Sequence, residues 1–179
     1  MLITSVMVLF STPMITVALI VLLLDRNFGT QYFSVPGGGD PLLWQNLFWF
    51  YSHPAVYIMV LPAMGIVSEV LPVFSRKPLF GHAFIAWSSV FIAVLGFAVW
   101  AHHMFQVGSP LSVDTFFAAA SMVIAVPPGI KIFNWIGTLW GGAIRLTSAM
   151  LFALGFIAMF VIGGLSGVML AVVPINWQV

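Results

Sequence analysis

Three of the four histidines in this 179-residue chain lie where two apolar segments could bring them together. His53 lies in the segment 44–73, and the adjacent residues His102 and His103 lie near the end of the segment 82–105. Imidazole is the commonest protein ligand for copper, zinc and iron, and three imidazoles leave a position open for a reactant. The spacing is compatible with two interpretations: a catalytic metal site, or packed histidines that hydrogen-bond to each other.

Sharing one metal between adjacent histidines requires a distorted backbone. Neighbouring side chains on a regular α-helix point about 100° apart, so His102 and His103 would not face the same ion. Gly108 and Pro110 follow shortly and indicate that the helix ends in this region. A metal site here therefore predicts irregular backbone at the histidine pair.

Hydroxyl side chains accompany His53 along its segment. Tyr57 follows it by four residues and shares its helix face, where a phenol could donate a proton or an electron. The alternative, an interfacial aromatic residue, fits poorly because Tyr57 lies too deep for the headgroup belt. Tyr51 and Ser52, about one turn earlier, extend a polar track in an otherwise apolar segment.

Lys131 lies deep inside another apolar segment, 115–140. A lysine at mid-bilayer costs about 2.5–3.5 kcal/mol on insertion scales, so such residues usually face a bundle interior and mark a pathway. The alternative interpretation is a structural lysine whose amine binds backbone carbonyls.

The elements that position these residues are predicted to be membrane helices. Charged residues make up 5% of the chain, against about 25% in a soluble domain. Hydrophobic residues reach 62%, and the mean hydropathy is +1.16. This composition excludes a soluble globular domain, a disordered segment and a nucleic-acid-binding protein. With no cysteine, the chain has no disulfide, thiolate metal site or cysteine nucleophile.

We predict an all-α fold: a polytopic membrane helix bundle that forms one embedded domain over residues 1–179. Glycine, proline or charged residues separate its apolar stretches. The five stretches long enough to span a bilayer are 2–24, 44–73, 82–105, 115–140 and 146–173.

The positive charges predict the orientation of the bundle. Arg76 and Lys77 follow the second segment and Arg145 follows the fourth, whereas the loops on the opposite face carry only Arg26. Because basic loops favour the cytoplasmic or matrix side, the three histidines are expected in the outer half of the membrane.

Prolines are predicted to break two of these helices. Pro54 and Pro62 lie in the second segment, and Pro127 and Pro128 lie in the fourth. Each removes a backbone hydrogen bond, which membrane helices tolerate where neighbours or water satisfy the backbone. Ordinary kinks are the alternative to functional breaks.

These residues stand in motifs that resemble subunit I of the haem–copper oxidases. The resemblance covers the whole chain in order, and its motifs are long and correctly spaced. They are WFYSHPAVY at 49–57, VWAHHMF at 99–105 and PPGIKIFNW at 127–135, with DRN at 25–27, GGGDP at 37–41 and the paired glycines of the final helix.

The resemblance implies a role for each of the histidines in question. His53, His102 and His103 would be the three ligands of the active-site copper, CuB. Tyr57 would be cross-linked to His53 and would supply an electron and a proton when the O–O bond breaks. A tyrosine on the helix of the first copper ligand is the pattern of the aa3- and bo-like oxidases, unlike the cbb3-type and nitric oxide reductase branches.

The resemblance also implies two proton paths, and this chain departs from the family in both. Lys131 and Ser68, with Tyr57, would belong to the K-type path from the inner side. The position before the glycine of that motif, often threonine, is Pro128, so the path must be rebuilt by water or another hydroxyl.

In the other path, Ala55 replaces the usual glutamate. Tyr51 and Ser52 match the bacterial variant that carries a Tyr-Ser pair one turn earlier. We expect these two hydroxyls to take over the proton relay.

The whole enzyme implied by the resemblance reduces O2 to water with electrons from cytochrome c and moves protons across the membrane. Quinol is the alternative donor. Besides copper, the whole enzyme would hold two haems of the a type, whose axial ligands lie outside this chain, since His82 is at a loop edge. Its partners would be subunits II and III, the donor, O2 and the lipid bilayer, with no nucleic acid.

We accordingly expect an internal fragment of a twelve-helix subunit, inactive alone. The bacterial plasma membrane is favoured over the mitochondrial inner membrane. The alternatives are a free-standing five-helix ion transporter lined by the histidines and Lys131, and an inactive gene piece.

Overall fold

The computed structural model describes residues 1–178, and within them the chain is helical with no strand. The all-α prediction is confirmed. The elements are α1 (Leu2–Asn27), η1 (Val35–Gly37), α2 (Pro41–Ser75), α3 (His82–Gly96), η2 (Trp100–Met104), α4 (Leu111–Val123), α5 (Val126–Leu139), α6 (Ser148–Leu170) and α7 (Val173–Asn176).

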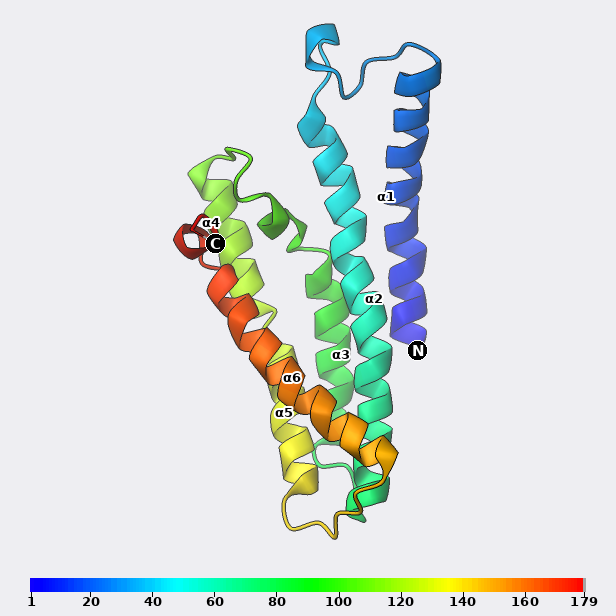
Figure 1. Cartoon of the computed structure of the whole chain (residues 1–179), viewed down its shortest axis with the longest axis vertical. Helices are drawn as coiled ribbons and strands as arrows, with labels where there is room; N and C mark the ends of the chain where they lie inside the picture. Colours follow the sequence, from blue (N-terminus) through cyan, green and yellow to red (C-terminus); the bar gives the residue numbers. More distant parts are fainter. Residues whose placement is uncertain (179) are drawn as a thin grey trace.

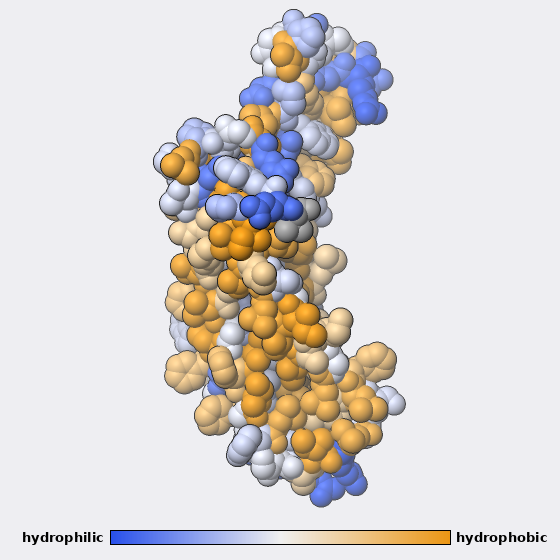
Figure 2. All heavy atoms as spheres, turned by 60° about the vertical axis from the view of Figure 1, so that its left-hand side comes forward, coloured by the Kyte–Doolittle hydropathy of each residue, from blue (hydrophilic) through white to orange (hydrophobic). Residues whose placement is uncertain are grey.

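The helices form an elongated bundle whose surface fits a bilayer. Helices α1, α2 and α3 run side by side along the long axis, and α6 crosses the lower half obliquely (Figure 1). Within residues 1–178, four spans are long and apolar enough to cross a membrane: α1, α2, the α4–α5 pair and α6. In Figure 2 the hydrophilic residues gather towards the two ends of the long axis and the apolar ones cover the middle. The prediction of a polytopic membrane bundle is confirmed.

The core lies where α2, α3 and α5 meet. Helix α1 packs along α2, while α3 contacts both α2 and α5. Leu71 of α2, Ile92 of α3 and Trp135 of α5 are completely buried there. These packed apolar side chains fix the relative positions of the helices that carry the polar residues.

The prolines have different effects in the two helices that contain them. Helix α2 is one continuous helix of 35 residues that includes Pro54 and Pro62, so the predicted break in it is wrong. A single missing N–H is tolerated inside a membrane helix. By contrast, α4 ends at Val123, and Pro127 and Pro128 lie in the first turn of α5, where a helix needs no N–H donor. The break predicted there is confirmed.

The third predicted segment is not one helix. Helix α3 ends at Gly96, after 15 residues, and helical structure resumes at Trp100 as the 3₁₀-helix η2. This is the irregular backbone expected for adjacent histidines that share an ion. The bounds of the other helices differ from the predicted ones by a few residues. Helix α2, for example, begins at Pro41, because the side chain of Asp40 caps it by accepting a hydrogen bond from the Leu42 N–H at 2.8 Å.

Candidate metal centre

Helix α2 and the 3₁₀-helix η2 bring three imidazoles together. Nδ1 of His53 lies 3.2 Å from Nε2 of His103, and Nε2 of His102 lies 3.2 Å from the same atom. One potential ligand nitrogen from each ring lies within 4.8 Å of the other two. The prediction that these residues meet at one point therefore matches the geometry.

The backbone alone does not align the adjacent histidines. Successive side chains in a 3₁₀-helix still diverge by about 120°. Yet the ring centroids of His102 and His103 lie only 4.4 Å apart, and both rings present Nε2 towards the cluster. The two side chains therefore converge because each ring turns inward to His53.

The nitrogen spacing fits a bound cation. Nε2 of His103 faces one nitrogen of each neighbour, but a single ring nitrogen offers only one N–H or one lone pair. Two nitrogens bound at about 2.0–2.1 Å to one tetrahedral ion would lie about 3.3–3.4 Å apart, close to the separations seen. An all-imidazole set of this kind suits copper, zinc or iron.

Ser121, on α4, fixes the protonation of one of these rings. Its hydroxyl donates to the Phe117 carbonyl at 2.6 Å, so its oxygen is left to accept from Nδ1 of His102 at 2.8 Å. With the proton on Nδ1, the lone pair of His102 is on Nε2, which faces the other rings. Sequence reasoning missed Ser121.

Aromatic residues hold the other two rings. Trp49 stacks on His103 with centroids 3.8 Å apart and planes 8° from parallel. Tyr57 lies edge-on to His53 at a centroid distance of 4.8 Å. Nε2 of His53 is buried and has no hydrogen-bond partner among residues 1–178, so only one of its two nitrogens takes part in the histidine cluster.

Close helix packing positions Tyr57. Its ring packs against Gly96 of α3, where an added Cβ would lie 3.0 Å from Cδ2 of the ring. Glycine at this position lets α3 approach the tyrosine just before the backbone turns into η2.

Lys131 lies apart from the histidines, buried between α5 and α3. Its amine donates to the Ile85 carbonyl at 3.0 Å and to the Ser89 hydroxyl at 2.6 Å. The alternative interpretation, a structural lysine whose amine binds backbone carbonyls, therefore holds for one of these two hydrogen bonds. Sequence reasoning did not single out Ser89.

The remaining predicted site residues are placed separately. Ser68 accepts from Nε1 of Trp135 at 2.9 Å and donates to the Met64 carbonyl at 2.8 Å, so it does not contact the lysine amine directly. Tyr51 and Ser52 are half-buried on α2 before His53, and their side chains make no hydrogen bond within residues 1–178.

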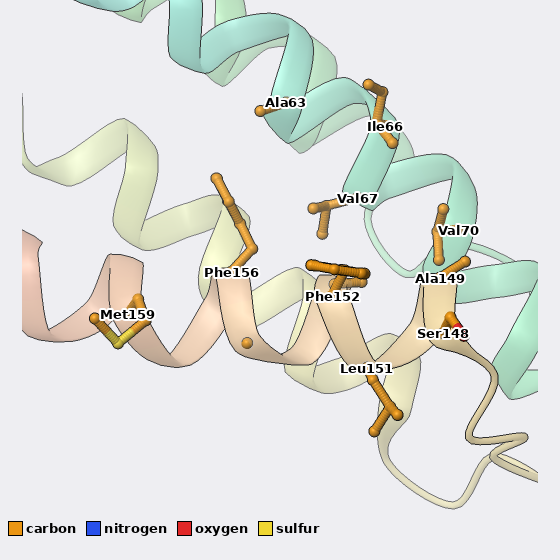
Figure 3. A pocket seen from close by; sticks show the side chains of 12 residues that line it. Ala63, Ile66, Val67, Val70, Ser148, Ala149, Leu151, Phe152, Phe156 and Met159 are labelled. Atoms are coloured by element: carbon orange, nitrogen blue, oxygen red, sulfur yellow. The ribbon is translucent and has the colours of Figure 1, made fainter.

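An apolar pocket lies between α2 and α6 and differs in chemistry from the histidine cluster. Figure 3 shows apolar side chains such as Val67, Phe152 and Phe156 pointing into it. No histidine, lysine, aspartate or glutamate lines this pocket. The pocket therefore offers no acid–base group, unlike the histidine cluster and Lys131.

Comparison with known proteins identifies the family of the chain. A family model described as "Cytochrome C and Quinol oxidase polypeptide I" matches residues 1–179. Cytochrome c oxidase subunit 1 of Synechocystis sp. is 59% identical over 179 residues, which is 100% of this chain and 32% of that protein. The corresponding protein of Thermostichus vulcanus is 54% identical over 179 residues, again 100% of this chain and 32% of that protein. That of Bacillus subtilis is 50% identical over 176 residues, 98% of this chain and 28% of the relative.

The chain thus spans about a third of the length of the curated relatives that it matches. The family model nevertheless covers it from end to end, including all three histidines and Lys131. The chain belongs to the family of cytochrome c and quinol oxidase polypeptide I.

Proposed function

We propose that this chain is the part of a haem–copper terminal oxidase subunit that holds the active-site copper and the end of a proton path. The observation that carries the proposal is the convergence of three imidazole nitrogens beside a tyrosine. Family membership supports it, because the relatives are cytochrome c oxidase subunits.

In this proposal His53, His102 and His103 hold copper, with Ser121 and Trp49 orienting two of the rings. Bound copper, together with a haem of the complete subunit, would supply the electron-transfer and oxygen-binding chemistry. The residues present fit a copper ion by their donor type and by their nitrogen separations. The fourth histidine, His82, is exposed, and we propose no haem ligand within this chain.

Tyr57 is the proposed source of a proton and an electron for O–O bond cleavage. Its ring lies against His53, whose Nε2 has no hydrogen-bond partner among the described residues. A covalent bond from this nitrogen to a ring carbon of the tyrosine would replace the imidazole N–H and one ring C–H, with the two protons and two electrons passing to O2 in the complete enzyme, and it would hold the phenol beside the reaction site.

Lys131 is proposed to carry protons from the inner side towards Tyr57, with Ser68 in the same path. On the other approach, Tyr51 and Ser52 are proposed to relay protons in place of the glutamate that Ala55 replaces. Their half-buried positions beside His53 support this role. If Tyr51→Phe with Ser52→Ala still pumped protons at full stoichiometry, the relay would be excluded.

The complete protein would be a twelve-helix subunit in a bacterial plasma membrane, with two haems and with subunits II and III as partners. It would reduce O2 to water with electrons from cytochrome c and translocate protons. Quinol is the second candidate donor, because the family description names both kinds of oxidase.

Purified oxidase complex made from the full-length gene tests the proposal. Copper is measured by mass spectrometry, and oxygen consumption is recorded with reduced cytochrome c and then with a quinol. Tyr57→Phe should retain copper and lose oxygen reduction, whereas Tyr32→Phe, at an exposed loop residue, should retain both. A complex without copper, or a fully active Tyr57→Phe variant, would refute the assignment.

A further inference from the structure

The contacts of Lys131 come from α3 and not from its own helix. Its amine donates to the Ile85 carbonyl at 3.0 Å and to the Ser89 hydroxyl at 2.6 Å. The Ser89 hydroxyl in turn donates to the Ile85 carbonyl at 3.0 Å, so its oxygen is free to accept from the lysine. These three groups form a closed triangle in which every polar atom has a partner.

The first turn of α5 offers no hydroxyl to this amine. Pro128 stands three residues before Lys131, at the spacing where side chains on one helix meet, and it has no polar side-chain atom. Ser68 is already engaged by Trp135 and Met64. Ser89 is the one hydroxyl that contacts the lysine amine among the described residues.

We propose that Ser89 is a positioning residue for proton transfer through Lys131, and that it supplies from α3 the hydroxyl that Pro128 cannot supply from α5. The proposal rests on the proton path described under the proposed function. Neither the sequence motifs nor the family resemblance assigns Ser89 a role.

A hydroxyl suits this position because it can accept and donate. When Lys131 is an ammonium, the Ser89 oxygen accepts one of its N–H bonds. After the lysine has passed a proton onward, its neutral amine has a lone pair, and the Ser89 O–H can rotate from the Ile85 carbonyl to donate to it. No proton is gained or lost by the serine. The carbonyl of Ile85 can only accept, so it can bind an N–H of the neutral amine but cannot donate to its lone pair.

The location of Ser89 also points towards the copper site. Gly96, against which Tyr57 packs, follows Ser89 by seven residues, which is two turns or about 10 Å along α3. Residues seven apart lie on nearly the same helix face. Ser89 therefore holds the lysine amine at the face of α3 that leads to Tyr57.

Single substitutions in the assembled, full-length oxidase test this inference. The measured quantity is the rate of proton-coupled reduction of the haem–copper centre, followed by stopped-flow absorbance. Ser89→Ala should lower it about tenfold, since a hydrogen bond to a charged group is worth about that factor. Ser89→Thr keeps the hydroxyl and should retain most of the rate.

The neighbouring serine provides a matched control. Ser88 is buried on α3 and donates to the same Ile85 carbonyl at 2.8 Å, but it does not contact Lys131. Ser88→Ala should therefore leave the rate near that of the unmodified enzyme, with unchanged haem absorbance and copper content in all variants.

The two possible failures are distinguishable. Equal rates for Ser89→Ala, Ser88→Ala and the unmodified enzyme, with Lys131→Met slow, would overturn the role of Ser89 alone. A Lys131→Met enzyme that reduced its centre at the full rate would overturn the proposed path, and the inference with it. A slow Ser89→Ala enzyme that Ser89→Thr does not rescue would indicate a packing defect and would also overturn the inference.

Discussion

The histidine cluster and the Lys131 site differ in burial and in what satisfies their polar atoms: His53 is buried but His103 is exposed, whereas Lys131 is buried. At the histidine cluster the ring nitrogens face one another at 3.2 Å. At Lys131 the amine faces a carbonyl and a hydroxyl of the neighbouring helix. The first site gathers lone pairs and fits an added cation, whereas the second already contains its cation and surrounds it with acceptors.

The difference extends to the elements that build each site. The histidines require α2, the non-α segment η2 and a hydrogen bond that His102 donates to Ser121 of α4, which together direct three rings to one point. Lys131 lies between two regular helices, α3 and α5. The proposed metal site thus draws on three elements, one of them non-α, and on the inward turn of two rings, whereas the lysine proposed to carry protons is held between two regular helices.

Removing one imidazole should have the largest effect, because the cluster has no spare ligand. In the assembled enzyme, His103→Ala leaves two imidazoles, so we expect loss of copper and a more than about 100-fold fall in oxygen reduction. Copper is measured by mass spectrometry, and oxygen uptake with an electrode.

His82→Ala is the matched control, since His82 is exposed at the start of α3. It should keep both copper and activity. Full copper content in His103→Ala would show that the three rings are a packed cluster and not a ligand set.

Removing the buried cation should have the next largest effect and should spare the metal. Lys131→Met keeps an unbranched side chain between α5 and α3 but cannot carry a proton. We expect turnover to fall about 100-fold, as for loss of a general acid–base group. Copper content should not change, and its loss would show that the two sites are not independent.

Removing the hydroxyl that orients His102 should weaken the metal site without abolishing it. Ser121→Ala frees Nδ1 of His102 and no longer fixes the proton there. Loss of such an outer partner typically lowers metal affinity about 10–100-fold. The affinity is measured by competition with a copper chelator.

Ser121→Thr retains the hydroxyl and should bind copper normally, and Ser112→Ala, at an exposed position of the same helix, is the control. Unchanged affinity in Ser121→Ala would mean that the Trp49 and Tyr57 contacts alone hold the rings in place.

Most of the fold and the meeting of the three histidines could be predicted from the sequence because both rest on strong local signals. Long apolar runs end at glycine, proline or charge, and histidines are conspicuous within them. The two serines that support the sites carry no such signal. Ser121 and Ser89 each hydrogen-bond to a carbonyl four residues earlier, as serines in helices often do.

What distinguishes these serines is a partner from another element, 19 residues away for Ser121 and 42 for Ser89. Only the packed fold shows which helices meet. The effect of each proline on its helix could not be predicted from the sequence either, since Pro54 and Pro62 lie within a continuous helix and Pro127 and Pro128 lie at the start of one. Side-chain type alone does not tell these cases apart.

The smallest predicted effect is on stability near Lys131. Trp135 is completely buried on α5, and its indole N–H donates to Ser68 on α2. Trp135→Phe removes this hydrogen bond, which is worth about 1 kcal/mol, and leaves a small void. We expect the Tm of the assembled complex to fall by a few degrees, as measured by thermal unfolding.

The control is Trp140→Phe, because Trp140 is 78% exposed at the end of α5 and its indole makes no hydrogen bond within residues 1–178. It should leave the Tm unchanged. An equal Tm for Trp135→Phe would show that the bond to Ser68 contributes nothing to the packing of α5 on α2. The lysine would then be positioned by its α3 contacts alone, and the lysine site and the histidine cluster would differ even more in how many helices each one needs.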